Sequence, residues 1–271
     1  MKFITSPAIS RHRAVTHAFL TRIGGVSTGP FASLNFNEND SDDVSAVAEN
    51  RAKTGRLLRF DADMLFTVRQ VHGDRVLVID NATDISSLLH KGVRPEADAI
   101  LTSKKGLAIG VLTADCVPII LADPVKKVIG IVHAGWRGTI AGICGKAVTN
   151  MRDHFGSHIE DISAAIGPSI GPCCYEVGEE VAASFLTGSF REKVVVANSN
   201  GGRGKLDLRK AAKLLLLESG VEEGNISVSP LCTSCNTDLF FSYRREGTPT
   251  GRQLSFVVMN APIKRESEES P

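Results

Sequence analysis

Short runs of apolar residues, separated by polar turns, recur along most of the chain. Runs of this length predict β-strands, because helices usually need ten or more residues. The predicted strands lie at residues 15–20, 65–71, 75–80, 98–102, 107–113, 117–122, 127–133, 161–166, 193–197, 239–243 and 253–259. Strands therefore dominate the expected fold.

Longer segments predict helices at residues 42–58, 138–155, 176–187 and 207–219. The first opens with Ser41 as the expected N-cap, and Asp42 and Asp43 follow in the first turn, where negative charge stabilises the helix dipole. The last ends before Gly220, at a position where glycine is common. Helices and strands do not alternate strictly, which favours a mixed α+β fold.

The chain shows no convincing internal boundary. No linker rich in proline, glycine or serine divides it, and its length is enough to bury a substantial core. We therefore expect a single domain over residues 1–271. The segment 264–271 is charged and lacks apolar anchors, so we expect it to fray.

The composition is that of a soluble globular protein, with 42% hydrophobic residues, 23% charged residues and a net charge of +1. A nearly neutral chain is not expected to bind nucleic acid through bulk electrostatics. No apolar run approaches the roughly 20 residues that span a bilayer, and residues 1–15 lack the apolar core of a signal peptide. The six cysteines therefore indicate reduced thiols in the cytoplasm.

Two histidines and one cysteine lie at the edges of predicted strands. His72 follows a strand in FTVRQVHGD, Cys116 precedes one in TADCVPIILAD, and His133 ends one before AGWRG. Three such side chains from separate strand ends can bind a borderline-soft metal ion and leave a fourth position open. An open position is typical of catalytic zinc, so we predict a catalytic zinc site.

Each of these residues also has a simpler interpretation. Alone, His72 is more often a surface turn residue, Cys116 a small buried hydrophobe, and His133 part of a tightly packed turn. The coincidence of all three at strand–turn junctions is what favours a site. The neighbouring Asp115 either accepts a hydrogen bond from a ligating imidazole or caps nearby backbone N–H groups.

Four of the other cysteines form two short motifs. Cys232 and Cys235 have C-x-x-C spacing, which is half of a zinc ribbon, and no second pair follows. A thioredoxin-like redox role is open, but no helix obviously starts at the first cysteine to lower its pKa, so a structural role is favoured. Cys173 and Cys174 lie in the loop GPSIGPCCYEVG, which either presents backbone N–H groups to an anion or is a rigid connector.

Two regions carry arginines that could face a ligand. The polar loop 21–35 contains Arg22 and is long enough to line a pocket or act as a lid. Arg244, Arg245 and Arg252 form a second basic cluster, suited to phosphate or carboxylate. The simpler interpretation of each is a solvated surface charge.

These motifs resemble the YfiH-like family, also labelled laccase-domain or multicopper polyphenol oxidase-like and related to the human protein FAMIN. The matching pieces are TRIGGVSTGPFASLN, ENR at 49–51, QVHG, ADAILT, TADCVPIILAD, HAGWRGT, GPSIGPCCYEVG, LDL and CTSCNTDLFFSYRREG with TGRQ. They span nearly the whole chain in the family's order. Two departures are Asn37, where the family often has glycine, and the sequence RKAAKLLLLES, which lacks the family's usual Asn and Gln.

The resemblance implies a four-layer α/β/β/α fold with mixed sheets, similar to that of a bacterial deamidating toxin. It implies zinc, or copper in older accounts, bound by His72, Cys116 and His133. It further implies a purine nucleoside phosphorylase that cleaves adenosine, inosine and methylthioadenosine and also deaminates adenosine.

Such an enzyme would have a small-molecule nucleoside and phosphate as its partners. Arg51 and Arg22 are the candidates for anion or ribose contacts, and Asn35 is the candidate for a hydrogen bond to the base or sugar. We expect neither nucleic acid nor a membrane as a partner, and a monomer or weak homodimer.

Three other functions remain open. A cysteine hydrolase would use Cys116 as nucleophile and His133 as base. The resemblance implies a substrate for it, since some bacterial members of the family are assigned to the removal of wrongly loaded serine from a UDP-muramyl peptidoglycan precursor. A copper polyphenol oxidase is disfavoured, because the seven histidines include no H-x-H pair for a multicopper centre. A zinc-stabilised interaction module without catalysis would have a closed tetrahedral site.

Overall fold

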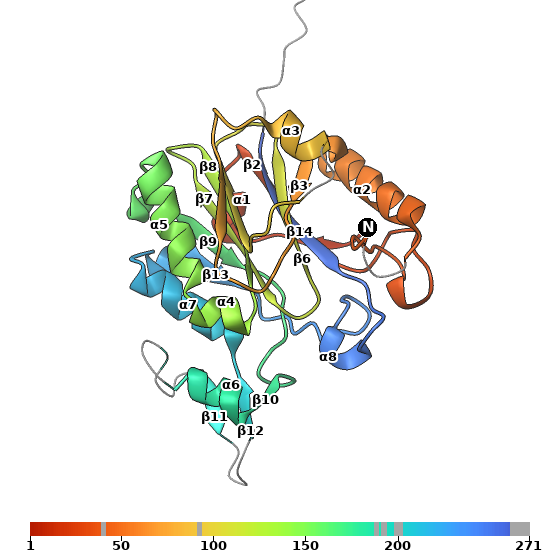
Figure 1. Cartoon of the computed structure of the whole chain (residues 1–271), viewed down its shortest axis with the longest axis vertical. Helices are drawn as coiled ribbons and strands as arrows, with labels where there is room; N and C mark the ends of the chain where they lie inside the picture. The colour runs from red at the N-terminus through yellow and green to blue at the C-terminus, as the bar shows by residue number, and fades with distance from the viewer. Residues whose placement is uncertain (39–41, 91–93, 187–189, 191–193, 198–202, 261–271) are drawn as a thin grey trace, which may run out of the picture.

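The structure, a computed structural model, describes the chain except for residues 39–41, 91–93, 187–189, 191–193, 198–202 and 261–271. Two large β-sheets form its centre (Figure 1). The five-stranded sheet has the order β1 (Phe3–Ile4), β2 (Val15–Leu20), β14 (Gln253–Met259), β6 (Ala108–Thr113), β3 (Leu65–Thr67). The six-stranded sheet has the order β13 (Ile226–Val228), β9 (Ser163–Ile166), β7 (Val117–Asp123), β8 (Val128–Ala134), β5 (Ala99–Thr102), β4 (Val76–Ile79).

Both sheets are mixed. In the five-stranded sheet β3 pairs with β6 in parallel, whereas β14 pairs with β2 and β6 in antiparallel fashion. In the six-stranded sheet β4–β5 and β13–β9 are parallel, and the β7–β8 hairpin is antiparallel. The mixture agrees with the absence of strict βαβ alternation in the sequence.

Helices cover the outer faces of the two sheets. The α-helices are α1 (Pro7–Ser10), α2 (Val44–Leu58), α3 (Ile85–His90), α4 (Trp136–Ile140), α5 (Ile143–Phe155), α6 (Glu179–Ser184), α7 (Leu208–Glu218) and α8 (Tyr243–Glu246). Short 3-10 helices lie at Gly29–Phe31, Ala62–Met64, Ile159–Asp161 and Glu223–Asn225. In Figure 1, α5 and α7 lie outside the six-stranded sheet, and α2 lies on the opposite side of the molecule.

Strand alternation divides the core between these layers. Ile120 in β7 belongs to the cluster between the two sheets, with Phe19 of β2 and Val257 of β14. Its neighbours Ile119 and Leu121 face the other way and pack in the cluster that includes α5 and α7. The predicted four-layer α/β/β/α arrangement is therefore confirmed.

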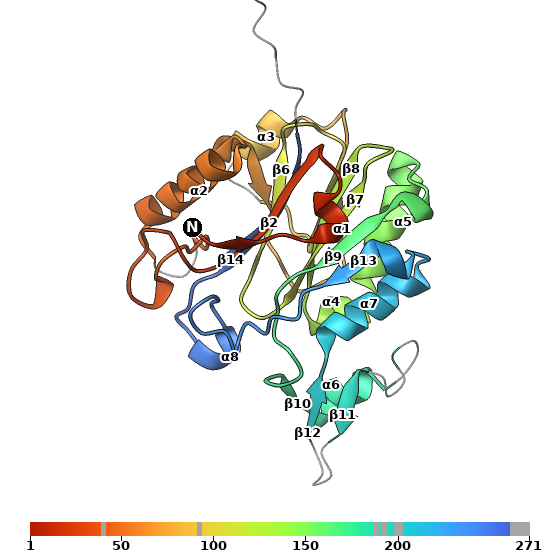
Figure 2. The ribbon, with the colours of Figure 1, turned by 180° about the vertical axis from the view of Figure 1, so that it is seen from behind.

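A third, smaller sheet carries the order β10 (Glu176–Gly178), β12 (Arg203–Leu206), β11 (Val195–Ala197). Together with α6 it projects from one end of the two large sheets, as both views show (Figures 1 and 2). The segment predicted to fray, 264–271, lies outside the described residues. Among the described helices, none combines the length and apolar character required to cross a membrane.

The predicted helix ends needed revision. The first helix starts at Val44, and its N-cap is Asp43, whose carboxylate accepts the backbone N–H of Ser45; the predicted cap, Ser41, lies outside the described residues. The helix predicted at 138–155 is two helices, because Gly142 between them adopts φ +79°. The helix predicted at 176–187 begins with β10, so only Glu179–Ser184 is helical within the described residues.

Two strand predictions were wrong for identifiable reasons. The strand predicted at 65–71 ends at Thr67, because the chain then leaves β6 and crosses to the other sheet, where Arg69 bridges Glu96. The segment 239–243 is not a strand, although Phe240 and Phe241 are fully buried. Its backbone turns instead, and the Gln253 side chain hydrogen-bonds both the N–H and the carbonyl of Phe241.

Candidate active site

His72, Cys116 and His133 meet at one point. Their ligand atoms all lie within 4.8 Å of one another, and the two imidazole rings meet edge to face with centroids 4.8 Å apart. His133 is buried, Cys116 is half-buried and His72 is exposed. The structure thus brings together the three residues that the sequence singled out.

The path of the chain explains this convergence. His72 lies where the chain crosses from β3 in one large sheet to β4 in the other, and Cys116 lies where it crosses from β6 to β7. His133 lies near the end of β8, paired with Pro118 of the neighbouring strand. Two crossings between the sheets and one strand end therefore deliver the three side chains.

Gly135 leaves the space that the three side chains occupy. A Cβ added there would lie 3.0 Å from His72 Cδ2 and 3.3 Å from Cys116 Sγ. Its φ of −75° is open to any residue, so the requirement for glycine is steric. A side chain in the turn after β8 would therefore crowd the cluster, and its neighbours would have to shift by a few tenths of an ångström.

A buried carboxylate, Asp98, organises the site. Its Oδ1 lies 2.8 Å from Nδ1 of His133 and accepts a hydrogen bond from that nitrogen. The backbone N–H groups of Val71, His72 and Gly73 donate to the same carboxylate at 2.7–3.2 Å. Asp98 therefore fixes both histidines, one through its ring and the other through its backbone, and leaves Nε2 of His133 free to bind a ligand.

Cys116 and His133 shift each other's pKa in opposite directions. Burial raises the pKa of Cys116, but the charge and hydrogen bond of His133, together with His72, lower it more, to about 6. Burial lowers the pKa of His133, but the charge of Cys116 and the hydrogen bond of Asp98 raise it more, to about 9. At neutral pH the metal-free pair is a thiolate beside an imidazolium.

Of the two roles expected for Asp115, the structure shows the capping of nearby groups and not a hydrogen bond from an imidazole. Its carboxylate accepts hydrogen bonds from Thr233 Oγ1 at 2.6 Å, Ser242 Oγ at 3.0 Å and the Arg244 backbone N–H at 2.7 Å. Asp115 thus anchors the segments beside the site, and the carboxylate hydrogen-bonded to His133 is Asp98. Asp98 was missed in the sequence, where its only signal is a carboxylate immediately before the buried run AILT.

A cavity of about 1260 Å³ opens onto the three residues. Its aromatic wall includes Trp136, Tyr175 and Tyr243. Its arginines are Arg51, Arg69, Arg94, Arg137, Arg244 and Arg252. Aromatic faces suit a planar heterocycle, and guanidinium groups suit phosphate.

Only one of the three predicted substrate-binding residues lines this cavity. Arg51 does so, and it pairs with Glu38 at 2.7 Å. Arg22 stacks on Phe241 and pairs with Glu246. Asn35 is fully buried, and its side chain bonds Asn37, Asp42 and the backbone N–H of Arg252. Both residues support the loops, because their polar atoms are directed at the protein.

Arg137, which sequence reasoning passed over within the motif HAGWRGT, is exposed at the cavity. Its guanidinium stacks on the Trp136 ring at 4.3 Å from the centroid. By contrast, Arg51, Arg69 and Arg94 at the same cavity are each paired with a carboxylate. Arg137 is therefore well placed to meet an anion.

Comparison with known proteins places these observations in a family. The profile of the family described as multi-copper polyphenol oxidoreductase laccase matches residues 16–260. The chain is 42% identical over 258 residues to a purine nucleoside phosphorylase of Deinococcus radiodurans, with 94% of each chain covered. It is 38% identical over 245 residues to adenosine deaminase RL5 from an unknown prokaryotic organism, with 89% of this chain and 92% of that protein covered.

The fold is shared as well. The crystal structure of the Bacillus licheniformis hypothetical protein YfiH matches with a TM-score of 0.87 and 35% identity, over 95% of this chain and 99% of that one. Relatives named as enzymes confirm the expectation that the chain is an enzyme. The chain belongs to the multi-copper polyphenol oxidoreductase laccase family, the YfiH-like family that its motifs resemble.

Proposed function

We propose that the protein is a zinc-dependent purine nucleoside phosphorylase that cleaves adenosine, inosine and methylthioadenosine and also deaminates adenosine. The cluster of His72, Cys116 and His133 in the wall of an arginine-rich and aromatic cavity carries this proposal. The names of the relatives support the substrate class. The partners are then a small nucleoside and phosphate, and the place of action is the cytoplasm.

The donor set fits zinc. Two imidazole nitrogens and one thiolate within 4.8 Å of one another are ligands that a tetrahedral zinc ion accepts. The hydrogen bond from His133 Nδ1 to Asp98 is the usual support of a ligating imidazole, because it fixes the ring and its tautomer. A zinc ion held there supplies a Lewis acid that polarises a substrate oxygen or acidifies water.

Phosphorolysis makes a clear demand on the chain's own residues. A phosphate oxygen forms a bond to C1′ of the ribose while the bond from C1′ to N9 breaks, and the purine leaves with the electron pair and takes up a proton. Arg137 is our candidate to hold the phosphate, since its guanidinium faces the cavity without a carboxylate partner among the described residues.

The aromatic wall suits the purine. Trp136 and Tyr175 are both half-buried and line the cavity. Two arginines that also line the cavity stack on these rings, Arg137 on Trp136 at 4.3 Å and Arg244 on Tyr175 at 5.1 Å. A ring held in this way resists rotation, so it offers a fixed face on which a planar base can stack.

The central experiment measures products directly. Purified protein is incubated with adenosine, inosine or methylthioadenosine, with and without phosphate, and ribose 1-phosphate, free base and inosine are quantified. We expect phosphate-dependent base release and phosphate-independent inosine formation, both lost in His72→Ala and after chelation. Absence of product above the His72→Ala control would falsify the proposal.

A second variant separates the phosphate contact from the rest of the site. Arg137→Gln should raise the KM for phosphate about tenfold, the effect of losing one charge-assisted hydrogen bond, and leave adenosine deamination unchanged. Arg69→Gln is the matched control, because Arg69 also lines the cavity but pairs with Glu96. Equal KM values in the two variants would rule out Arg137 as the phosphate anchor.

A second function is favoured by one specific observation. The Cys116 thiolate lies beside the His133 imidazolium, whose Nδ1 bonds the buried Asp98 carboxylate, and a cysteine hydrolase uses these same three groups. Its substrate would be an amide, such as that of a UDP-muramyl-serine precursor. Because a metal bound to Cys116 blocks its nucleophilicity, the two functions compete for one sulfur atom.

The two functions respond oppositely to a chelator. As a hydrolase, the protein as isolated should release serine from UDP-muramyl-L-serine, and iodoacetamide should inactivate it at once. As a zinc enzyme, Cys116 should resist alkylation until a chelator removes the metal. The order of chelation and alkylation therefore decides between the two functions.

A further inference from the structure

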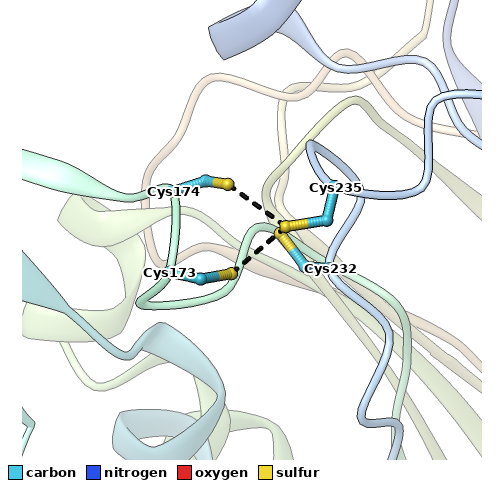
Figure 3. Close-up of side chains that lie close together, drawn as sticks. All are labelled: Cys173, Cys174, Cys232 and Cys235. Atoms are coloured by element: carbon cyan, nitrogen blue, oxygen red, sulfur yellow. Dashed lines mark hydrogen bonds between the residues drawn. The ribbon is translucent and has the colours of Figure 1, made fainter.

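Four cysteines outside the site described above also meet at one point. The sulfur atoms of Cys173, Cys174, Cys232 and Cys235 all lie within 4.8 Å of one another. Figure 3 shows the four side chains pointing inward from two separate segments. Cys235 Sγ lies 3.4 Å from Cys173 Sγ and 3.3 Å from Cys174 Sγ. The two short motifs that the sequence presents separately are therefore halves of one cluster.

The backbone around this four-cysteine cluster is built for it. Ser169 forms an isolated parallel bridge with Cys232, which aligns the two segments. The Gly171 N–H donates to Cys232 Sγ at 3.2 Å, a contact that stabilises a thiolate. A Cβ at Gly171 would lie 3.2 Å from Cys173 Sγ and 2.7 Å from Arg209 Nη2, so only glycine fits comfortably there.

The spacing of the sulfur atoms identifies the kind of ligand. Zinc–sulfur bonds of about 2.3 Å in a tetrahedron place the sulfurs about 3.8 Å apart, which agrees with contacts of 3.3 and 3.4 Å inside a cluster no wider than 4.8 Å. A disulfide would unite only two of the four. Tetrahedral sites with four sulfur ligands are typical of zinc.

We propose that Cys173, Cys174, Cys232 and Cys235 bind one zinc ion as a closed structural site, separate from the His72–Cys116–His133 cluster. Binding would release the thiol protons, since zinc is held by thiolates. All four positions of the ion are then filled by protein, so this site has no room for substrate. Its role is to fasten the two segments together.

By holding the two segments together, the zinc ion would also hold the wall of the cavity in position. The first segment continues directly into Tyr175, and the second bonds Asp115 through Thr233. Arg245 donates to the carbonyls of Thr233 and Ser234 in the C-x-x-C turn, at 3.0 and 2.9 Å. The preceding residue in the chain, Arg244, stacks on Tyr175 at 5.1 Å. A zinc ion at the four cysteines would therefore hold the aromatic wall in place from behind.

The zinc content per chain tests the four-cysteine site without any measurement of enzyme activity. The full chain is purified without metal-affinity steps, equilibrated with zinc under reductant, desalted and measured by mass spectrometry of the metal. We expect two zinc ions per chain for the wild type, one for Cys235→Ser and one for His133→Ala. Cys144→Ala is the matched control: Cys144 is a buried cysteine outside both clusters, and two ions should remain.

A thiol titration covers the case in which Cys235→Ser does not fold. In His133→Ala, an organomercurial that blocks thiols should release the remaining zinc, and a cobalt-loaded sample should show the intense sulfur-to-cobalt charge-transfer bands of a tetrathiolate. Equal zinc contents in the wild type and Cys235→Ser, no zinc in His133→Ala, or iron in place of zinc would overturn the assignment. A disulfide within the cluster in protein kept under reductant would do the same. None of these readouts depends on nucleoside turnover, so the two proposals fail separately.

Discussion

Asp98 Oδ1 accepts a hydrogen bond from Nδ1 of His133 over 2.8 Å, and both side chains are almost completely shielded from solvent. A carboxylate in this position orients the ring and raises its basicity toward a metal ion on the opposite nitrogen. Since the same carboxylate receives three backbone N–H groups of the segment that carries His72, it couples the placement of both histidines.

Asp98→Asn should weaken the metal site while leaving the fold in place. The amide keeps the size of the carboxylate but loses its charge, and its NH2 group cannot accept a hydrogen bond. We expect zinc affinity at this site to fall 10- to 100-fold, as is typical when such a partner is lost. Competition with a calibrated chelator measures this. Asp123→Asn is the control, because Asp123 is an equally buried aspartate at the far end of β7.

Gly135→Ala should disturb the site by steric contact alone. The added methyl would lie 3.0 Å from His72 and 3.3 Å from Cys116, so the ligands must move apart and zinc affinity should fall at least tenfold. Gly178→Ala is the matched control. Gly178 also lies directly before a helix and has an extended backbone, with φ −70°, but a Cβ added there would meet no atom within 4 Å. Equal zinc affinity in the two variants would show that the gap at Gly135 is not needed.

Metal-free Cys116 should react with iodoacetamide at unusually low pH. The thiolate is the reactive form, so the rate rises with pH through the pKa of about 6 and is half-maximal there. His133→Gln removes the cation that lowers this pKa, and the rise should move to higher pH. Cys144 is the internal control, because burial raises its pKa to about 12 and it should stay unmodified. Peptide mass spectrometry across a pH series separates the two cysteines.

His17 should make the folded state sensitive to mild acid. Burial lowers its pKa from 6.5 to about 4, and its Nε2 accepts the N–H of Ser6 at 2.8 Å. Below pH 6.5 His17 is protonated in the unfolded chain, whereas in the folded chain it stays neutral until the pH falls to about 4. The contribution of His17 to the free energy of unfolding is therefore complete above pH 6.5 and falls as the pH is lowered toward 4. The total loss below pH 4 is about 3 kcal/mol.

Urea unfolding at several pH values in this range measures that loss. His17→Gln keeps a hydrogen-bond acceptor but cannot be protonated, so its free energy of unfolding should depend less steeply on pH than that of the wild type. His154→Gln, a change of an exposed histidine, should keep the wild-type slope. If the wild type and His17→Gln respond alike, another group is responsible for the acid sensitivity.

Much of the fold followed from the sequence because apolar runs and turns are local signals. The strands at Val15–Leu20 and Gln253–Met259 coincide with their predicted ranges, since each is a continuous buried run. The prediction at 239–243 was wrong because burial alone does not make a strand: Phe240 and Phe241 fill the core from a turn. Local pattern cannot distinguish the two cases.

The sequence by itself determined the strand-rich α+β class and the three residues at strand ends, His72, Cys116 and His133, because residue type and position beside a turn are visible in one dimension. Tertiary structure alone decided that Asp98 supports His133, that Arg22 and Asn35 face the protein, and that two distant cysteine motifs form one cluster. The physical reason is that these contacts depend on strand register and on crossings between sheets, which join residues far apart in the chain.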